Sequence, residues 1–241
     1  MAVNLKRSNY AYKYPFERIA AYASSVVAKY GDPSKVKALD FGFGAGRHLK
    51  LLQDLGCDSY GIDVTEDAID TAYYHFGENF IAREKLVIDN ILEHAVYPDK
   101  TFDVVLSVGV VWALGYDKMI EFLDKIIPLI KNGGYFIANF RTKFDDLYLS
   151  DHSHGGGAKE AYVPDFNSFW AFLDIEELRE LMGHYGLCIE LLERYDRYCN
   201  NEECISYWCV AARKEGSYGE TAIRGDQADA RAASQDPVSG T

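Results

Sequence analysis

The sequence predicts an α/β fold of the Rossmann-like kind, in which a mostly parallel sheet of seven strands carries helices on both faces and ends in an antiparallel hairpin strand. Three observations support this prediction. Between residues 36 and 140, short β-rich runs alternate with longer amphipathic runs, which is the pattern of a parallel sheet with crossover helices. A glycine-rich turn follows the first strand. Near the end of the chain, β-rich runs at 187–194 and 204–211 flank a polar turn, which predicts an antiparallel hairpin.

Hydrophobic spacing places the individual elements. Strands are expected where β-branched and aromatic residues form short apolar runs, at 36–41, 58–62, 85–88, 102–107 and 135–140. Helices are expected where apolar residues recur every three or four positions, at 47–55, after an N-cap at Thr65, at 117–130, and at 174–185 with Asp174 as N-cap. Pro128 should end or kink the third of these helices. The repeated unit is a strand, a helix and a second, parallel strand.

The chain is expected to form one domain over residues 1–213, because domains commonly span about 100 to 200 residues. The alternation stops at residues 141–172, where histidine, glycine and aromatic residues gather. This insert is a candidate lid, and its glycines at 155–157 would allow a hinge. Residues 214–241 contain almost no large apolar side chains, so they are expected to form a disordered tail.

Composition and charge narrow the function classes. The 241 residues include 37 acidic and 25 basic ones, and the net charge of −12 opposes attraction to phosphate backbones and anionic lipid surfaces. No apolar run approaches the ~20 residues of a membrane span, and the amino-terminal segment lacks the apolar region of a secretory signal. The five cysteines form no CxxC pair, so we expect reduced thiols and no metal site. These features predict a cytoplasmic protein that binds neither nucleic acid nor membranes.

The strongest local signal is the turn at 40–47, Asp-Phe-Gly-Phe-Gly-Ala-Gly-Arg. Glycine permits positive φ and lets a ligand approach the backbone where a Cβ would collide, so three alternating glycines exceed what a tight turn needs. Two cofactor interpretations compete. A dinucleotide fingerprint is G-x-G-x-x-G, whereas here the third glycine comes one residue early, and Asp40 would repel a pyrophosphate. S-adenosylmethionine fits better, because it carries an ammonium and a sulfonium group and no phosphate.

The sequence resembles the class I S-adenosylmethionine-dependent methyltransferases from about residue 15 to residue 211. Five segments carry the resemblance in the expected order, at 36–47, 60–63, 89–90, 102–107 and 129–136, with the expected hairpin after them. Each segment alone is weak, but their order makes the match specific. One residue departs from the family pattern: Phe43 stands where a cysteine or serine is usual. That side chain normally packs away from the cofactor, so we expect the variation to be tolerated.

The resemblance implies roles for the residues of these segments. Asp40 and the glycine turn would hold the methionyl part of the cofactor, and Asp63 would accept hydrogen bonds from both ribose hydroxyls. Asp89, with Asn90 beside it, would accept from the adenine amino group. Two alternatives stay open, since Asp63 also suits a helix amino terminus and Asp89 also suits an exposed loop. The implied cofactor residues are Asp40, Gly42, Phe43, Gly44, Gly46, Asp63, Val64, Asp89, Asn90 and Ser107.

The methyl acceptor is narrowed by motifs that the sequence lacks. The element [DN]-P-P-[YFW], typical of exocyclic-amine methylation in nucleic acids, is replaced by Ser-Val-Gly-Val at 107–110. No Pro-Cys nucleophile is present, which disfavours covalent attack on a pyrimidine ring. A small-molecule acceptor remains.

Aromatic residues could enclose that acceptor, and a histidine could take its proton. An extended segment would place Tyr10, Tyr12 and Tyr14 on one face, although they could equally seal a helix onto the sheet. Either His152 or His154 could be the base, because imidazole titrates near neutral pH, or both could be solvated loop residues. Trp112 could shape the pocket or pack in the core. The candidate acceptor residues are Tyr10, Tyr12, Tyr14, Trp112, Tyr162 and Trp170.

These observations predict a methyltransferase that uses S-adenosylmethionine on an oxygen or nitrogen of a small metabolite, such as a sugar or a natural-product intermediate. We expect it to be a monomer or a homodimer. Two other functions remain open: a catalytically silent relative that serves as a partner subunit, and an NAD-dependent oxidoreductase.

Overall fold

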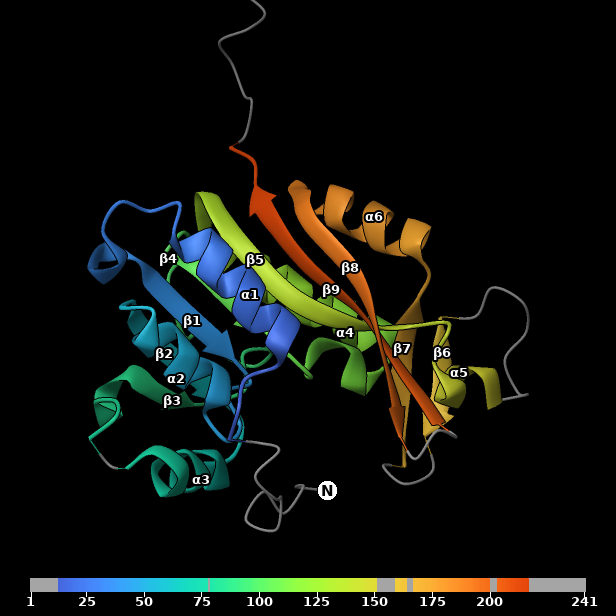
Figure 1. The fold of residues 1–241 in the computed structure, drawn as a ribbon, viewed down its shortest axis with the longest axis horizontal. Helices are drawn as coiled ribbons and strands as arrows, with labels where there is room; N and C mark the ends of the chain where they lie inside the picture. Colours follow the sequence, from blue (N-terminus) through green and yellow to red (C-terminus); the bar gives the residue numbers. More distant parts are fainter. Residues whose placement is uncertain (1–12, 78, 151–158, 164–166, 200–202, 217–241) are drawn as a thin grey trace, which may run out of the picture.

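The computed structural model describes residues 13–77, 79–150, 159–163, 167–199 and 203–216. They form one twisted sheet with helices on both faces (Figure 1). The predicted tail falls almost wholly outside the described residues, as do the glycines proposed as a hinge. Within the described part of the chain, no helix is both long enough and apolar enough to cross a membrane.

The parallel part of the sheet confirms the predicted strands. Its order is β3-β2-β1-β4-β5, and all four neighbouring pairs are parallel. The carboxyl ends of these strands therefore meet at one edge, which is where open α/β sheets bind ligands. The strands are β1 Lys37–Phe41, β2 Asp58–Asp63, β3 Leu86–Ile88, β4 Phe102–Ser107 and β5 Ile130–Thr142.

The helices divide between the two faces of the sheet. Buried residues of α1 and α2 pack on one face with alternate residues of β1, β4 and β5, and α3 packs beside α2. Buried residues of α4 and α6 cover the opposite face. Each helix thus buries its apolar stripe against strands whose side chains alternate between the faces. The helices are α1 Glu17–Val27, α2 Arg47–Asp54, α3 Glu66–Phe76, α4 Tyr116–Ile126 and α6 Ile175–His184.

The predicted helix ends agree closely with the structure. Asp174 caps α6, because its carboxylate accepts from the backbone N–H groups of Glu176 and Glu177, and the Glu177 side chain completes a capping box. Thr65 occupies the N-cap position of α3, although its side chain makes no capping hydrogen bond. The third helix ends at Ile126, and Pro128 lies in the short 3-10 turn that follows.

The carboxyl-terminal hairpin is also confirmed. It consists of β8 Leu187–Cys199 and β9 Glu203–Lys214, and β9 adds antiparallel to β5 over residues 135–141. Both strands extend beyond the predicted runs. β5 also extends beyond its predicted run, because its pairing with β9 and β7 continues as far as Thr142.

The insert corrects the expected number of strands. It contains the short helix α5 Asp146–Ser150 and a hairpin of β6 Glu160–Val163 and β7 Ser168–Leu173, so the described residues form a sheet of nine strands where seven were expected. Arg141 pairs with Phe172 of β7 and with Tyr207 of β9, which places β7 and β9 on opposite edges of β5. Because β4 pairs with β5 only as far as Ala138, β7 continues along the edge that β4 leaves. The insert is thus part of the sheet at its ligand-binding end.

Candidate active site

The glycine turn joins β1 to α2 and has the backbone that its sequence predicts. Gly42, Gly44 and Gly46 all have positive φ, at 73°, 48° and 79°. A Cβ on Gly42 would collide with the side chain of Val110, and one on Gly46 would lie 2.8 Å from the Cβ of Ala72. A Cβ on Gly44 would meet nothing closer than a backbone oxygen at 4.0 Å. Gly44 therefore faces open space, and this is the cradle that a side chain would fill.

Phe43 lies beneath this cradle, in agreement with the expectation that its side chain points away from a ligand. The ring is buried in a cluster with Leu49 and Ala72, and it fills the space beside Gly61 of β2. The backbone N–H of Gly42 donates to the carbonyl of Ile62 at 2.8 Å. The turn is thus held against β2 by both its side chain and its backbone.

Asp40 is a buried carboxylate at the end of β1, with 1% of its surface exposed. Burial raises its pKa to about 7, and the nearby charge of Arg47 opposes that rise. The carboxylate accepts a hydrogen bond from the backbone N–H of Leu49 in the first turn of α2, which also opposes the rise in pKa. Its Oδ2 atom has no hydrogen-bond partner among the described residues. A buried, unpaired carboxylate oxygen beside an open cradle fits an ammonium donor, as the methionyl end of S-adenosylmethionine would supply.

Asp63 ends β2 and ties the glycine turn to the next helix. Its Oδ2 accepts from the backbone N–H of Gly44 at 2.9 Å, and its Oδ1 accepts from the N–H groups of Val64 and Thr65 at 2.8 and 3.2 Å. The carboxylate thus accepts hydrogen bonds at the amino terminus of α3, which is the alternative role that the sequence left open for Asp63. Only Oδ2 retains room for a further donor. A ribose hydroxyl would have to reach that oxygen.

Asp89 and Asn90 follow β3 at the same edge of the sheet. Asp89 Oδ1 accepts from the backbone N–H of Asn90 at 2.7 Å and lies 2.7 Å from Nδ1 of His94. The hydrogen bond with His94 lowers the pKa of Asp89, and the same bond raises the pKa of His94. Asn90 itself donates to Glu93. A partner histidine for Asp89 was not predicted, because His94 lies in an irregular loop without periodicity.

The segment after β4 crosses the open edge of the sheet. Ser107 is fully buried, and its hydroxyl lacks a hydrogen-bond partner within the described part of the chain. The next residues turn away from the sheet and form a short 3-10 helix, Val111–Leu114, which places Trp112 beside the insert. Ser107 and Trp112 therefore lie where the sequence predicted, at the carboxyl end of β4.

Buried aromatic rings form a wall at this edge. The indole rings of Trp112 and Trp170 are 4.9 Å apart, and the Trp112 ring is 6.0 Å from the ring of Tyr207. Phe16, just before α1, is 5.9 Å from Tyr207. Trp112 and Trp170 are both more than nine-tenths buried, so they contribute to the core as well as to the wall. The structure brings these two predicted acceptor residues together.

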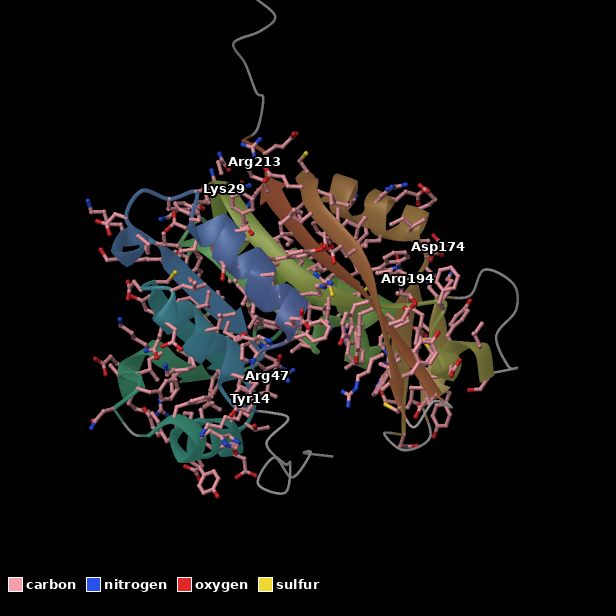
Figure 2. The ribbon with its side chains drawn as sticks, in the orientation of Figure 1. Tyr14, Lys29, Arg47, Asp174, Arg194 and Arg213 are labelled. Atoms are coloured by element: carbon pink, nitrogen blue, oxygen red, sulfur yellow. The ribbon has the colours of Figure 1, made fainter. Side chains whose placement is uncertain are left out.

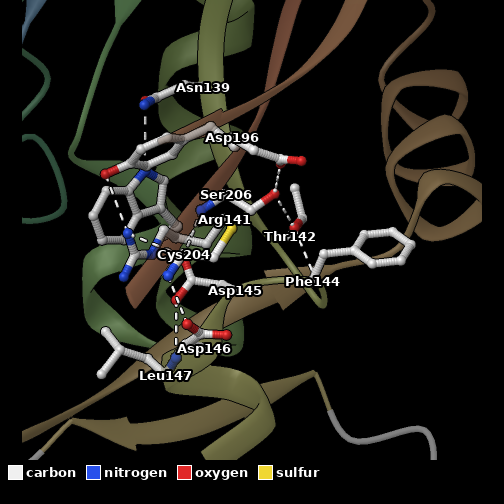
Figure 3. Close-up of polar contacts among 12 residues, drawn as sticks. Asn139, Arg141, Thr142, Phe144, Asp145, Asp146, Leu147, Asp196, Cys204 and Ser206 are labelled. Atoms are coloured by element: carbon white, nitrogen blue, oxygen red, sulfur yellow. Dashed lines mark hydrogen bonds and ion pairs between the residues drawn. The ribbon is translucent and has the colours of Figure 1, made fainter. Parts of the chain in front are cut away.

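Arg141 lies inside this wall and was not predicted. Its side chain is 3% exposed, and its guanidinium carbon lies 5.1 to 5.3 Å from the ring centres of Trp112, Trp170 and Tyr207. It pairs with Asp145 at 3.2 Å and donates to the Tyr207 hydroxyl at 3.2 Å (Figure 3). Burial raises the pKa of Asp145, and Arg141 opposes that rise. The ion pair of Arg141 and Asp145 joins β5 to the turn before α5.

Two further predicted acceptor residues, Tyr14 and Tyr162, do not join the wall. Tyr14 is 64% exposed and lies at the same end of the sheet as Arg47 (Figure 2). Tyr162 is 38% exposed and donates to Asn167 within its own hairpin, and the side chain of Val64 is exposed. Tyr10, Tyr12, His152 and His154 lie outside the described residues. The catalytic base thus stays a prediction.

His48 is a second residue that sequence reasoning missed. It lies in the first turn of α2, where it reads as an ordinary helix residue, yet it is almost fully buried. Its Nε2 accepts from the backbone N–H of Phe16 at 3.1 Å, and burial lowers its pKa to about 3. A neutral imidazole thus joins the segment before α1 to the helix that follows the glycine turn.

Comparison with known proteins agrees with this geometry. Residues 39–138 match the family model described as a methyltransferase domain, which spans β1 to β5 and contains the glycine turn, Asp63, Asp89 and Ser107. This part of the chain is therefore similar to a methyltransferase domain, in agreement with the resemblance to the class I S-adenosylmethionine-dependent methyltransferases. S-adenosylmethionine is the cofactor of that class, as the glycine turn predicted.

Solved methyltransferases share the fold at low sequence identity. The 1,6-didemethyltoxoflavin-N1-methyltransferase of Burkholderia thailandensis is 19% identical, with 82% of this chain and 79% of that chain covered and a TM-score of 0.60. A methyltransferase of Methanosarcina mazei is 16% identical, with coverage of 79% and 97% and a TM-score of 0.62. The magnesium protoporphyrin IX methyltransferase of Synechocystis is 16% identical, with coverage of 82% and 78% and a TM-score of 0.57. No curated protein matches the sequence.

Proposed function

We propose that this methyltransferase transfers the methyl group of S-adenosylmethionine to an oxygen or nitrogen of a small-molecule acceptor. The observation that carries the proposal is the cradle at Gly44, which is open to a ligand and lies in a turn that begins at Asp40, whose Oδ2 has no hydrogen-bond partner among the described residues. The bound cofactor supplies an electrophilic methyl group on a sulfonium. Methyl transfer of this kind depends mainly on proximity and orientation, which the protein provides by holding both reactants at one edge of the sheet.

The chain's own residues divide this task. Asp40 and the glycine turn would hold the methionyl part, Asp63 Oδ2 would accept from a ribose hydroxyl, and Asp89 would accept from the adenine amino group. Because Asp63 Oδ1 is already engaged by Val64 and Thr65, we infer a single ribose bond where the sequence suggested two. The buried wall around Trp112 and Trp170 would exclude water from the acceptor side.

A small acceptor is supported by what two of the related structures bind or act on. The B. thailandensis enzyme was crystallised with 1,6-didemethyltoxoflavin and S-adenosylhomocysteine, and the Synechocystis enzyme acts on magnesium protoporphyrin IX. Both acceptors are flat ring systems, and flat rings pack well against tryptophan and tyrosine side chains. We therefore propose that the acceptor of this protein is a flat metabolite or natural-product intermediate. The cytoplasmic location and the monomeric or dimeric state remain predictions.

Calorimetry with S-adenosylhomocysteine and with NAD tests the proposal. We expect the first to bind and the second not to bind, because the turn lacks a place for a pyrophosphate beside Asp40. Binding of NAD alone would support an oxidoreductase, and binding of neither would overturn the assignment of the glycine turn. If S-adenosylhomocysteine binds, incubation with methyl-labelled S-adenosylmethionine and a panel of flat phenols and heterocyclic amines tests for transfer. No transfer to any acceptor, in any fraction of a cell extract, would favour the silent partner subunit.

A further inference from the structure

Asn139 lies at a break in the pairing along one edge of β5, while β9 pairs with it on the other edge. β4 pairs with this strand as far as Ala138, and β7 pairs with it from Arg141, so residues 139 and 140 lie between the two partners. Asn139 is only 4% exposed, although a buried amide needs hydrogen bonds to offset the loss of water. Its position coincides with the point where the chain after β4 leaves the sheet.

The amide oxygen of Asn139 binds this departing segment. Oδ1 accepts from the backbone N–H of Gly109 at 2.7 Å and from Nε1–H of Trp112 at 3.5 Å (Figure 3). The first is a short bond that fixes the backbone, and the second is a longer bond that orients the indole. Gly109 has a φ of 80°, a conformation that glycine adopts readily, and Asn139 holds the backbone of the segment at this residue.

The same segment contacts the glycine turn. The side chain of Val110 fills the position that a Cβ on Gly42 would need, so residue 110 packs directly on the glycine turn, two residues before the cradle at Gly44. Trp112, two residues later, packs on Trp170 of the aromatic wall. The segment 109–112 therefore contacts the cofactor side with one residue and the acceptor side with another.

We propose that Asn139 is a positioning residue for methyl transfer, which through one amide oxygen fixes the segment 109–112 against both the cofactor cradle and the acceptor wall. The inference rests on the proposed function in one respect, namely that the cofactor lies on the glycine turn. Without Asn139 the segment would lose its anchor, and cofactor binding would have to order it again. Ordering a loop on binding lowers affinity, which is why preorganised sites bind more tightly.

Three substitutions test the proposal. Asn139→Leu keeps a branched side chain of similar size and removes the acceptor oxygen, and Asn139→Asp keeps an oxygen at the same place. Thr142→Val is the matched control, because Thr142 is fully buried on the same strand and its hydroxyl also makes two bonds, to Ser206 and to the N–H of Phe144. Those bonds lead to β9 and α5, away from the segment 109–112.

Two measurements are made on each protein. Calorimetry gives the affinity for S-adenosylhomocysteine, and thermal unfolding gives the stability. We expect Asn139→Leu to weaken binding on the order of tenfold, Asn139→Asp to stay within about twofold of wild type, and Thr142→Val to lower stability at unchanged affinity. In ¹⁵N-indole NMR spectra, the Trp112 N–H signal should move in Asn139→Leu and remain in Asn139→Asp.

The outcomes separate this proposal from the proposed function. If wild type does not bind S-adenosylhomocysteine, the proposed function is wrong. If wild type binds and a folded Asn139→Leu binds equally well, the positioning role is wrong. Equal losses of affinity in Asn139→Leu and Thr142→Val would also overturn it, because the effect would then follow stability alone. Should Asn139→Leu fail to fold, Asn139→Ala replaces it, since alanine removes the oxygen without inserting an apolar side chain.

Discussion

The buried His48 predicts a specific loss of stability in mild acid. Its Nε2 must stay unprotonated to accept from the N–H of Phe16, and burial lowers its folded pKa to about 3 from the usual value of 6.5. When folding lowers the pKa of a group, the folded state keeps its full stability at pH values above the unfolded pKa. Below that pH the stability falls, because the unfolded chain binds a proton and the folded chain does not.

The size of this effect follows from the unfolded pKa alone, as long as the folded pKa lies well below the working pH. At about pH 5.5 the unfolded histidine is protonated roughly ten to one, which costs the folded state about 1.4 kcal/mol, and at about pH 7.5 the cost is roughly 0.1 kcal/mol. His48→Gln removes the titration, and the glutamine oxygen can still accept from Phe16.

Urea unfolding of both proteins at the two pH values measures the difference. Between about pH 7.5 and about pH 5.5, wild type should lose roughly 1.3 kcal/mol more than His48→Gln. Other titrating groups change the slope of each protein, and Asp40 has the opposite sign because its raised pKa adds stability as pH falls. These groups are present in both proteins and cancel in the comparison. Parallel pH dependence of wild type and variant would show that His48 is not buried in its neutral form.

Three further substitutions test the cofactor site. Gly44→Val should abolish binding of S-adenosylhomocysteine measured by calorimetry, whereas the control Gly133→Val should retain it. Both glycines have positive φ and open space for a Cβ, but of the two only Gly44 faces the cradle. Equal affinities of the two variants would contradict the assignment of the cradle. Asp63→Ala should weaken binding by ~1.5–3 kcal/mol, the value of a charge-assisted hydrogen bond, and unchanged affinity would remove Asp63 from the site. Asp40→Asn should raise the stability of the ligand-free protein at about pH 8 by up to roughly 4 kcal/mol, because a carboxyl with a raised pKa carries a costly buried charge above that pKa. This gain in stability should shrink as pH falls through 7 towards the unfolded pKa of 3.8. The affinity of the variant for S-adenosylhomocysteine should be lower than that of wild type at every pH. A variant that is less stable than wild type at about pH 8 would show that the buried charge of Asp40 is compensated in wild type.

The sequence was sufficient for the features that depend on local pattern. The spacing of Gly42, Gly44 and Gly46 predicted their positive φ, and the apolar runs predicted the five parallel strands to within a few residues. The N-cap at Asp174 was predicted because the cap and the helix that it begins are adjacent in sequence. In each case the physical cause lies within a few residues of its effect.

The features that escaped prediction depend on distant partners. The hairpin of β6 and β7 pairs with β5 over only two residues, so no apolar period marks it as part of the sheet. Asn139 is a polar residue within the predicted strand 135–140, and Arg141 directly follows that strand, where a polar residue is typical of a strand end. The structure continues the strand because β9 pairs with it on one edge, and Tyr207 and Asp145 both contact Nη1 of the buried guanidinium. His48 was missed for the same reason, since its partner Phe16 is 32 residues away.

The junction between β5 and β7 also has a consequence for how this enzyme could diversify. The hairpin pairs with β5 at Arg141 and Thr142, and the glycine turn follows a different strand, β1. Exchange of residues 143–173 between homologous enzymes would therefore replace the insert as a single module, and it would reach the glycine turn through the segment 109–112, since Trp112 packs on Trp170. A graft would need to preserve Arg141 or its aromatic surroundings, because that guanidinium is where the module meets the scaffold.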